Sequence, residues 1–396
     1  MWWFVAIVCL IQATASSEEL TRRIRDVNPE THMNISESIS YKGYPSEEYE
    51  VLTDDGYYLA INRIPGGKNN LTITARPKPV VLLGHGILAE SKLWMINMAN
   101  KSLPFILADA GYDVWLGNNR GTAWSKKHLY LSADQEEFWD FSFHEMAMYD
   151  LPGMINFILK KTGQEQLHYI GDSQGCAIGF IAFSTMPELA KKIKMFFALA
   201  PVVSVKHVPS PAVKLLSSVS EHTIKDIFGK KDFTLLNPAG KTFLTKLCNY
   251  GFMNKLCNFA LLFAGGFNAG NINMSQAEVL TSCFPDTTSI KNLLHWRQTG
   301  ESGFRYFDYG SENQVRYNQS IPPSYKVEDM MVPTAVWSGG KDMIANPENM
   351  ENLISRITNL VYYCHFPDWT HWDFVGGMNA PQRMYYKVVE MIERSL

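Results

Sequence analysis

The stretch HYIGDSQGCAIGF, residues 168–180, decides the fold of this chain. Its first three residues predict a buried strand, and the residues that follow Gln174 predict a helix. Between them, Ser173 stands in a G-x-S-x-G pentapeptide with Gly171 and Gly175. A serine on a tight turn from strand to helix needs glycines there, because neighbouring Cβ atoms would clash. The alternative is an ordinary glycine-rich turn, but the predicted strand and helix on either side favour a nucleophile.

Short apolar runs alternate with longer amphipathic stretches around this motif, a pattern typical of a parallel α/β sheet. The strand-like runs lie at residues 48–52, 57–64, 80–83, 113–116, 196–200, 332–337 and 360–364. Between residues 205 and 317 the regular succession of strand-like runs is absent, and the sequence is a mixture of helix-like and loop-like segments. We therefore expect a largely helical cap or lid at 205–317, inserted between two parts of one core at 16–204 and 318–396. A separate domain is the alternative.

A serine nucleophile needs a base and an acid, and two later loops supply them. In the α/β-hydrolase fold, the acid and then the histidine follow the serine, each in a loop after a strand. Asp342 follows the run at 332–337, and His371 follows the run at 360–364. We therefore predict Ser173, Asp342 and His371 as the catalytic residues on an α/β-hydrolase fold.

Other titratable residues near His371 are weaker candidates. His365 ends a predicted strand before a proline, a position more typical of a structural histidine than of a base. Asp368 and Asp373 are too near His371 in sequence to approach its Nδ1 from a separate strand. We expect these two carboxylates to cap or solvate the loop.

Two backbone N–H groups must face the negative charge that develops on an ester carbonyl. One is expected from Gln174, the residue after the nucleophile, and the other from Ile87 in the first long loop. His85 and Gly86 precede Ile87, and the glycine allows the backbone to approach closely. We expect His85 to brace this loop by packing.

The composition excludes several function classes. With 396 residues, 46% apolar and 19% charged, the chain can bury a large core. A net charge of -3 and the lack of a Lys or Arg run argue against a nucleic-acid partner. No Cys or His pairs occur at ligand spacing on both sides of a loop, so no metal is expected, and nothing predicts an organic cofactor. The oligomeric state is left open.

The N-terminus and the glycosylation signals predict entry into the secretory pathway. Residues 1–15 form an apolar run that ends in small residues, which is typical of a signal peptide. The alternative is a short anchor, since the run is too short for a transmembrane span of ~20 residues. N-x-S/T sequons lie at Asn34, Asn70, Asn100, Asn273 and Asn318. We therefore expect a secreted or lysosomal glycoprotein.

The cysteine count leaves at least one free thiol once Cys9 is removed with the signal peptide. Cys248 and Cys257 could close a short loop, and a disulfide there would stabilise the fold by roughly 2–3 kcal/mol. The alternative is a pair of buried, unpaired thiols.

Over nearly its full length the chain resembles the acid lipase family of gastric, lingual and lysosomal lipases. The motifs that carry the resemblance are N-P-E at Asn28, Y-P-S-E-E-Y from Tyr44, D-G-Y at Asp55, H-G-I-L at His85, G-Y-D-V-W-L-G-N from Gly111, M-Y-D-L-P at Met148, G-x-S-Q-G at Gly171, V-W-S-G-G-x-D at Val336 and H-W-D-F at His371. The resemblance implies hydrolysis of triacylglycerols or cholesteryl esters under a cap that opens at a lipid–water interface. It places the triad, the oxyanion donors and the cap disulfide of the family on Ser173, Asp342 and His371, on Ile87 and Gln174, and on Cys248 and Cys257.

The chain departs from that family's pattern beside the nucleophile, where Asp172 takes the place of the usual histidine. A carboxylate ~7 Å from the reacting centre would oppose an oxyanion by at most about 2.4 kcal/mol at an effective dielectric of 20. The segment from Ser282 replaces the family's H-x-P-A-G, and Lys341 replaces a histidine beside Asp342. These changes leave the triad intact and bear on substrate preference and pH optimum.

Two other functions compete with a lipase. The first, which Asp172 favours, is a catalytically weak relative that binds lipid in the same pocket. Against it, a binding protein has no need for a strained turn. An esterase for short, dispersed acyl groups is the second alternative. The apolar cap segment at 259–263 favours a long-chain lipid over short groups, unless it is simply a buried helix.

Overall fold

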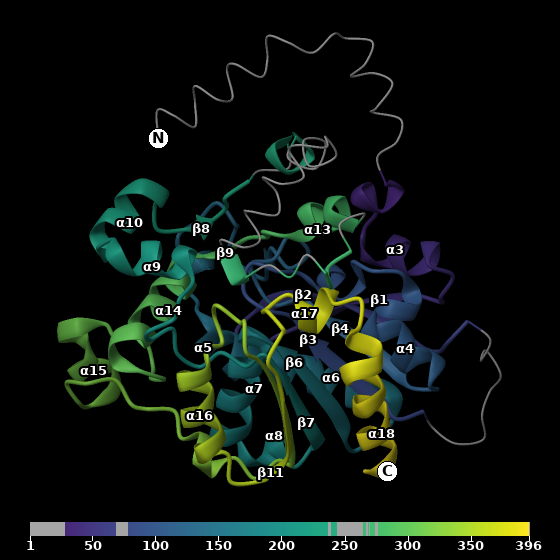
Figure 1. Cartoon of the computed structure of the whole chain (residues 1–396). Coiled ribbons are helices and arrows are strands. Elements are labelled where there is room, and N and C mark those ends of the chain that lie inside the picture. Colours follow the sequence, from purple (N-terminus) through teal and green to yellow (C-terminus); the bar gives the residue numbers. More distant parts are fainter. Residues whose placement is uncertain are drawn as a thin grey trace.

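The computed structural model describes residues 28–68, 78–236, 239–243, 264–266, 268, 270–273 and 276–395. A twisted sheet runs through the molecule, with its strands in the order β1-β2-β4-β3-β6-β7-β10-β11 and β5 beside β2 (Figure 1). The strands are β1 (Glu47–Leu52), β2 (Tyr57–Ile64), β3 (Val80–Gly84), β4 (Asp113–Gly117), β5 (Lys127–His128), β6 (Leu167–Asp172), β7 (Ile193–Leu199), β10 (Thr334–Gly339) and β11 (Leu360–Phe366).

The sheet is mostly parallel, as the sequence predicts. The neighbours from β4 to β11 pair in parallel, whereas β2 is antiparallel to both β1 and β4. All residues of β4 and β6 are buried, because helices cover both faces of a parallel sheet. The α/β class is therefore confirmed.

The helices of the core follow the strands in alternation. They are α3 (Ile35–Tyr41), α4 (Leu103–Asp109), α5 (Phe143–Glu145), α6 (Leu151–Thr162), α7 (Gln174–Thr185), α8 (Pro187–Ala190), α16 (Pro347–Arg356), α17 (Asp373–Gly376) and α18 (Tyr386–Arg394). A π-helical turn, η6 (Met146–Asp150), separates α5 from α6. Pro152, the second residue of α6, supplies no N–H to this turn, which favours the interruption.

The described chain between β7 and β10 is mostly helical. Its elements are α9 (Pro211–Ser218), α10 (Glu221–Phe228), β8 (Asp232–Phe233), α13 (Ala277–Cys283), β9 (Thr288–Ser289), α14 (Ile290–Ser302) and α15 (Asn313–Tyr317). In Figure 1, α9, α10 and α13 lie at the top of the view, and α8, α16 and β11 lie at the bottom. The expected cap boundaries at 205 and 317 fall within this stretch and stay a prediction.

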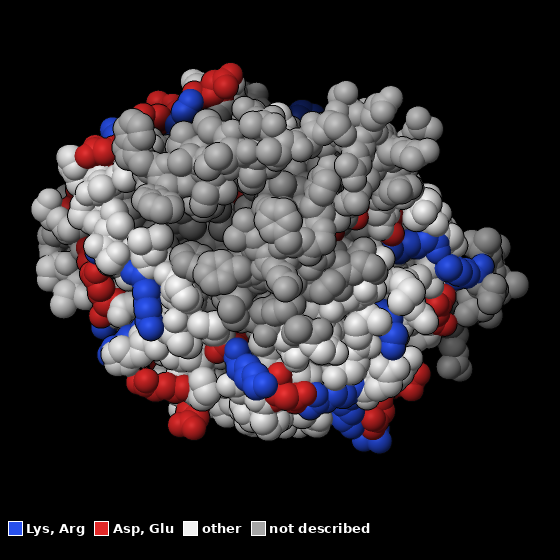
Figure 2. Space-filling model, turned by 45° about the horizontal axis from the view of Figure 1, so that its top comes forward, with Lys and Arg blue, Asp and Glu red and all other residues white. Residues whose placement is uncertain are grey.

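The surface in Figure 2 shows mixed charge. Around the rim of this face, Lys and Arg side chains of the described residues intermingle with Asp and Glu. Within the described ranges, no helix is both long enough and apolar enough to cross a bilayer.

Candidate active site

Ser173 occupies a strained turn between β6 and α7. Its φ of 53° and ψ of -114° lie in a region that residues with a Cβ rarely adopt. A Cβ built on Gly171 would lie 2.7 Å from the Gly175 carbonyl carbon, and one built on Gly175 would lie 2.5 Å from the Gly84 oxygen. The turn therefore has no room for a side chain at either glycine.

The Ser173 side chain lines a cavity of about 250 Å³. His371 and Asp172 lie on the same wall, and the other described lining side chains are apolar. They include Leu88 and Leu93 from the core, Val213 and Leu216 from α9, and Leu293 and Trp296 from α14. Helices of the expected cap and loops of the core thus enclose one apolar space at the carboxyl end of β6.

The loop after β10 brings Asp342 against His371. His371 Nδ1 donates to Asp342 Oδ2 at 2.8 Å, and the pair is buried. The other carboxylate oxygen, Oδ1, accepts hydrogen bonds from the backbone N–H groups of Ile344 and Ala345, both at 2.8 Å. These contacts fix the carboxylate, and the carboxylate in turn orients the imidazole ring and holds its proton on Nδ1.

The electrostatic surroundings of His371 favour its protonated form. Burial by itself lowers the pKa of the imidazole, but the charge and the hydrogen bond of Asp342 raise it, with a smaller contribution from Asp172. The net pKa lies above the ordinary value of 6.5. His371 is therefore a stronger base than a free histidine, which suits a group that must accept a serine proton.

The two predicted oxyanion donors are the backbone N–H groups of Gln174 and Ile87. Gln174 is the first residue of α7, so its backbone N–H has no carbonyl partner within the helix. Ile87 lines the cavity. His85 Nδ1 donates to the Gly86 carbonyl at 2.8 Å and fixes the peptide group whose N–H belongs to Ile87. The expectation that His85 braces this loop is confirmed.

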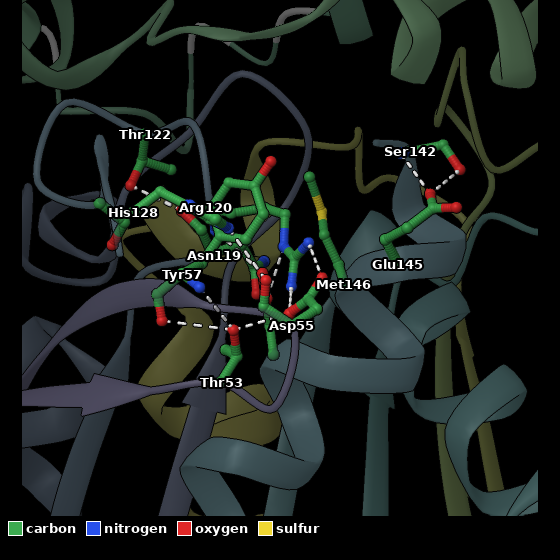
Figure 3. Close-up of polar contacts among 12 residues, drawn as sticks. Thr53, Asp55, Tyr57, Asn119, Arg120, Thr122, His128, Ser142, Glu145 and Met146 are labelled. Atoms are coloured by element: carbon green, nitrogen blue, oxygen red, sulfur yellow. Dashed lines mark hydrogen bonds and ion pairs between the residues drawn. The ribbon is translucent and has the colours of Figure 1, made fainter. Parts of the chain in front are cut away.

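A series of buried contacts fixes the position of His85. The Asn119 backbone N–H donates to His85 Nε2 at 3.1 Å. The next residue, Arg120, contacts Asp55 through Nη1 at 2.6 Å (Figure 3). Its Nε contacts Asp150 at 2.7 Å. Arg120 and Asp150 are buried, and this paired charge fixes the loop that carries Asn119.

Gln174 is also tied to the helix α14. Its side-chain oxygen Oε1 accepts from Trp296 Nε1 at 2.6 Å and from Asn292 Nδ2 at 3.0 Å. Asn292 Oδ1 in turn accepts from the Phe143 backbone N–H at 2.8 Å. A helix of the expected cap thereby anchors the residue that carries one oxyanion donor.

Asp172 ends β6 and is 4% exposed. Burial is the main cause that raises the pKa of its carboxyl group, to about 7. The charge of His371 lowers this pKa, and that of Asp342 raises it. Below neutral pH the side chain is therefore largely uncharged, which weakens the opposition to an oxyanion that a carboxylate here would exert.

Comparisons with known proteins decide the family. A family model described as alpha/beta hydrolase fold matches residues 79–377, and one described as partial alpha/beta-hydrolase lipase region matches residues 35–98. The lysosomal acid lipase/cholesteryl ester hydrolase of Homo sapiens is 52% identical over 391 residues and covers 98% of each chain. This chain belongs to the acid lipase family of α/β hydrolases.

Other members of the acid lipase family are similar over the same length. Human gastric triacylglycerol lipase is 49% identical over 395 residues, with 99% of both chains covered. Lipase member M of Mus musculus is 49% identical over 397 residues, with 100% of this chain and 93% of that chain covered.

Solved structures resemble the chain in fold alone. An alpha/beta hydrolase fold protein from Nakamurella multipartita has a TM-score of 0.51 at 15% identity, with 87% of this chain and 98% of that one covered. A bacterial membrane phospholipase A has a TM-score of 0.50 at 13% identity, with 99% and 96% covered.

In this acid lipase family member the alternative acids and base have other partners. Asp373 accepts from the Thr370 backbone N–H and hydroxyl, and Asp368 pairs with Arg383 at 2.6 Å. Both carboxylates hold the loop, as expected. His365 Nδ1 lies 2.8 Å from the Ser338 hydroxyl on the neighbouring strand, which is a structural contact.

Several predicted sites of the acid lipase fold are not tested by the structure. The signal peptide at 1–15, the sequon at Asn70 and the cysteines Cys248 and Cys257 lie outside the described residues. Asn100 and Asn318 are exposed, and Asn34 and Asn273 are partly exposed.

Cys176, Cys283 and Cys364 are free thiols. Among the described residues, no three His, Cys, Asp or Glu side chains gather as metal ligands would.

The residues that support the site were not predicted from the sequence. Asn292 and Trp296 are one helical turn apart on α14, both buried and both bonded to Gln174. A polar residue one turn before a tryptophan, on a largely apolar helix face, is the signal that could have found them. Asp150 stands in the M-Y-D-L-P motif, but nothing in the sequence pairs it with Arg120, which lies 30 residues away.

Proposed function

We propose that this chain hydrolyses carboxylic esters of neutral lipids, triacylglycerols or cholesteryl esters, through an acyl-enzyme intermediate on Ser173. The observation that carries the proposal is the meeting of the strained serine and the bonded His371–Asp342 pair at one apolar cavity. A strained backbone beside a buried acid–base pair is costly for a protein that only binds lipid.

The roles of the residues follow from their positions. Ser173 Oγ attacks the ester carbonyl carbon while His371 Nε2 accepts the hydroxyl proton. The backbone N–H groups of Ile87 and Gln174 stabilise the negative charge on the carbonyl oxygen. His371 then gives the proton to the departing alcohol, and Asp342 stabilises the imidazolium that forms between these steps.

Deacylation reverses the order of the proton transfers. A water molecule gives its proton to His371, and the hydroxide attacks the acyl carbonyl carbon on Ser173. Return of the proton to the Ser173 oxygen releases the fatty acid and restores the enzyme. Water takes the place of the alcohol, so no cofactor is required.

The cavity supports a lipid as the substrate. Apart from Asp172, Ser173 and His371, its described lining is apolar, which suits an acyl chain or a sterol. Similar relatives are called cholesteryl ester hydrolase and triacylglycerol lipase. The region at 205–317 acts as a cap that opens at a lipid–water interface and admits substrate to this space.

The site of action is the secretory pathway, either the lysosomal lumen or the extracellular space. The apolar run at 1–15 serves as signal peptide, and the sequons at Asn34, Asn70, Asn100, Asn273 and Asn318 carry glycans. Relatives named for the lysosome and for the stomach support this location. A disulfide between Cys248 and Cys257 stabilises the cap.

The test is fatty-acid release from emulsified triolein, emulsified cholesteryl oleate and soluble p-nitrophenyl butyrate. Ser173→Ala should lower each rate by about 10,000-fold or more. Ser184→Ala is the matched control, because its hydroxyl donates only to the Phe180 and Ile181 carbonyls of its own helix, α7, and it should keep full activity. Serine-dependent turnover of the short ester alone would indicate a short-chain esterase, and no serine-dependent turnover would indicate a lipid-binding relative.

A further inference from the structure

Asp172 is the only acidic residue among the described residues that line the cavity. Its side chain is almost wholly buried, and apolar groups make up most of the wall around it. Burial of a carboxyl group in such surroundings costs free energy unless hydrogen bonds replace the lost water. Hydrogen-bond donors are therefore expected around the carboxyl group of Asp172.

The carboxyl oxygen Oδ1 of Asp172 is buried and has no hydrogen-bond donor within the described part of the chain. The groups that act on it electrostatically are His371, Asp342, Cys176 and Tyr385. Asp342 is an acceptor, and the proton on His371 Nδ1 is already donated to it.

The remaining two donors are also engaged elsewhere. The Cys176 thiol points to the Gly171 and Leu199 carbonyls, at 3.0 and 3.3 Å. The Tyr385 hydroxyl donates to the Phe374 carbonyl at 2.8 Å. These neighbours are thus committed to other partners, and the carboxyl group of Asp172, which lines the cavity, has an unpaired oxygen.

The position of the other carboxyl oxygen, Oδ2, relative to the nucleophile follows from Gly86. A Cβ built on Gly86 would lie 3.1 Å from Ser173 Cβ and 3.3 Å from Asp172 Oδ2. The carboxyl group and the nucleophile therefore lie close together beside Gly86, and both line the same cavity. An ester that reacts with Ser173 must enter this cavity, and atoms next to its carbonyl group come close to Asp172.

We propose that Asp172 forms a hydrogen-bonding subsite for a free hydroxyl group next to the scissile ester. This inference rests on the proposed ester hydrolysis at Ser173 and adds a substrate preference to it. The hydroxyl can lie on the alcohol part, as in a partial glyceride, or on the acyl chain, as in a 2-hydroxy acyl ester. In both cases the same carboxyl group meets the same chemical group.

The electrostatics of the site favour a hydroxyl over a cation. Because burial raises the pKa of Asp172 to about 7, the group is mostly a neutral carboxylic acid below neutral pH. A neutral carboxylic acid can both donate to and accept from a hydroxyl, but it offers a cation no charge. The subsite thus favours esters with a free hydroxyl over fully substituted ones of the same chain length.

The test compares pairs of esters of similar shape in mixed micelles at a pH of about 6. On the alcohol side, 2-hydroxyethyl oleate is compared with n-propyl oleate. On the acyl side, methyl 2-hydroxypalmitate is compared with methyl palmitate. For each pair the ratio of kcat/KM is measured in wild type and in Asp172→Leu, so that differences in intrinsic ester reactivity cancel between the enzymes.

The wild-type ratio should exceed the Asp172→Leu ratio by about tenfold or more in at least one pair, because loss of the hydroxyl leaves a buried acceptor unpaired. Asp172→Asn, which keeps a donor and an acceptor, should retain most of the preference. Asp368→Asn, which removes an exposed carboxylate of the same region, should leave the ratios at their wild-type values.

The ester pair whose kcat/KM ratio falls in Asp172→Leu identifies which part of the substrate carries the hydroxyl. Equal ratios in wild type and Asp172→Leu for both pairs would overturn the subsite. Hydrolysis of the esters without a hydroxyl group distinguishes a failure of the subsite from a failure of the proposed function. If Ser173→Ala still hydrolyses n-propyl oleate at the wild-type rate, the reaction at Ser173 is wrong, whatever the ratios show.

Discussion

The indole N–H of Trp296 donates to the side-chain oxygen of Gln174 at 2.6 Å, and this bond joins α14 to the first residue of α7. Asn292 donates to the same oxygen from one helical turn earlier. All three side chains are buried. Because the Gln174 backbone N–H faces the oxyanion in our account, α14 sets the position of a group that acts on the transition state.

Asn292→Leu should lower kcat by about tenfold with little change in KM, since a small displacement of an oxyanion donor weakens transition-state binding alone. The inhibition constant of a trifluoromethyl ketone, whose adduct carries an oxyanion, should rise in proportion. Gln298→Leu is the matched control, because this amide bonds to Asp308 instead. A rise in KM alone, or an equal effect in both variants, would show that Asn292 does not position Gln174.

Asp342→Asn should lower kcat by about 1,000- to 10,000-fold, because an amide cannot hold the His371 proton on Nδ1 and stabilise the imidazolium. Thermal unfolding of the purified variant should remain cooperative, since an asparagine oxygen can still accept from Ile344 and Ala345. Activity within tenfold of wild type would exclude Asp342 as the acid.

The acid limb of kcat/KM should report the pKa of His371. His371 must be neutral to accept the serine proton, so the rate falls as the pH drops through a midpoint above 6.5. Asp172→Asn removes one of the charges that raise this pKa, and should move the midpoint to lower pH. Asp368→Asn serves as the control with an unchanged midpoint. A midpoint that stays or rises in Asp172→Asn would contradict the coupling.

Asp172 should make the fold less stable as the pH rises. Its carboxyl pKa is about 7 in the folded chain and 3.8 in its ordinary state. As the pH rises from about 4 to 7, the unfolded chain loses this proton first, so the stability present at acid pH is lost. The difference in Tm between Asp172→Asn and wild type should therefore grow over this interval. A constant difference would show that Asp172 ionises normally.

The sequence signals for the proposed catalytic centre are local. Ser173 lies in a motif with its own backbone requirement, and Asp342 and His371 follow apolar strands that are short and easy to recognise. The α/β fold follows from the same alternation of strands and helices. In parallel sheets the carboxyl ends of neighbouring strands meet, so residues far apart in sequence gather at one edge.

The supporting contacts could not be predicted, because they join distant parts of the chain. Gln174 is separated from Asn292 by 118 residues and from Trp296 by 122. The position of α14 relative to α7 depends on the packing of the cap, a region in which the sequence shows no regular succession of strands. The shifted pKa of Asp172 is likewise a consequence of burial, which the residue type alone does not reveal.

The most direct test of the central claim is covalent labelling with a p-nitrophenyl alkylphosphonate, which mimics the acylation of a serine nucleophile. Our account predicts the release of one equivalent of p-nitrophenol per chain, complete loss of lipase activity, and a phosphonate adduct that peptide mass spectrometry places on Ser173. Ser173→Ala should remain unlabelled. Stoichiometric labelling at another residue, or full activity after Ser173 is labelled, would contradict the account.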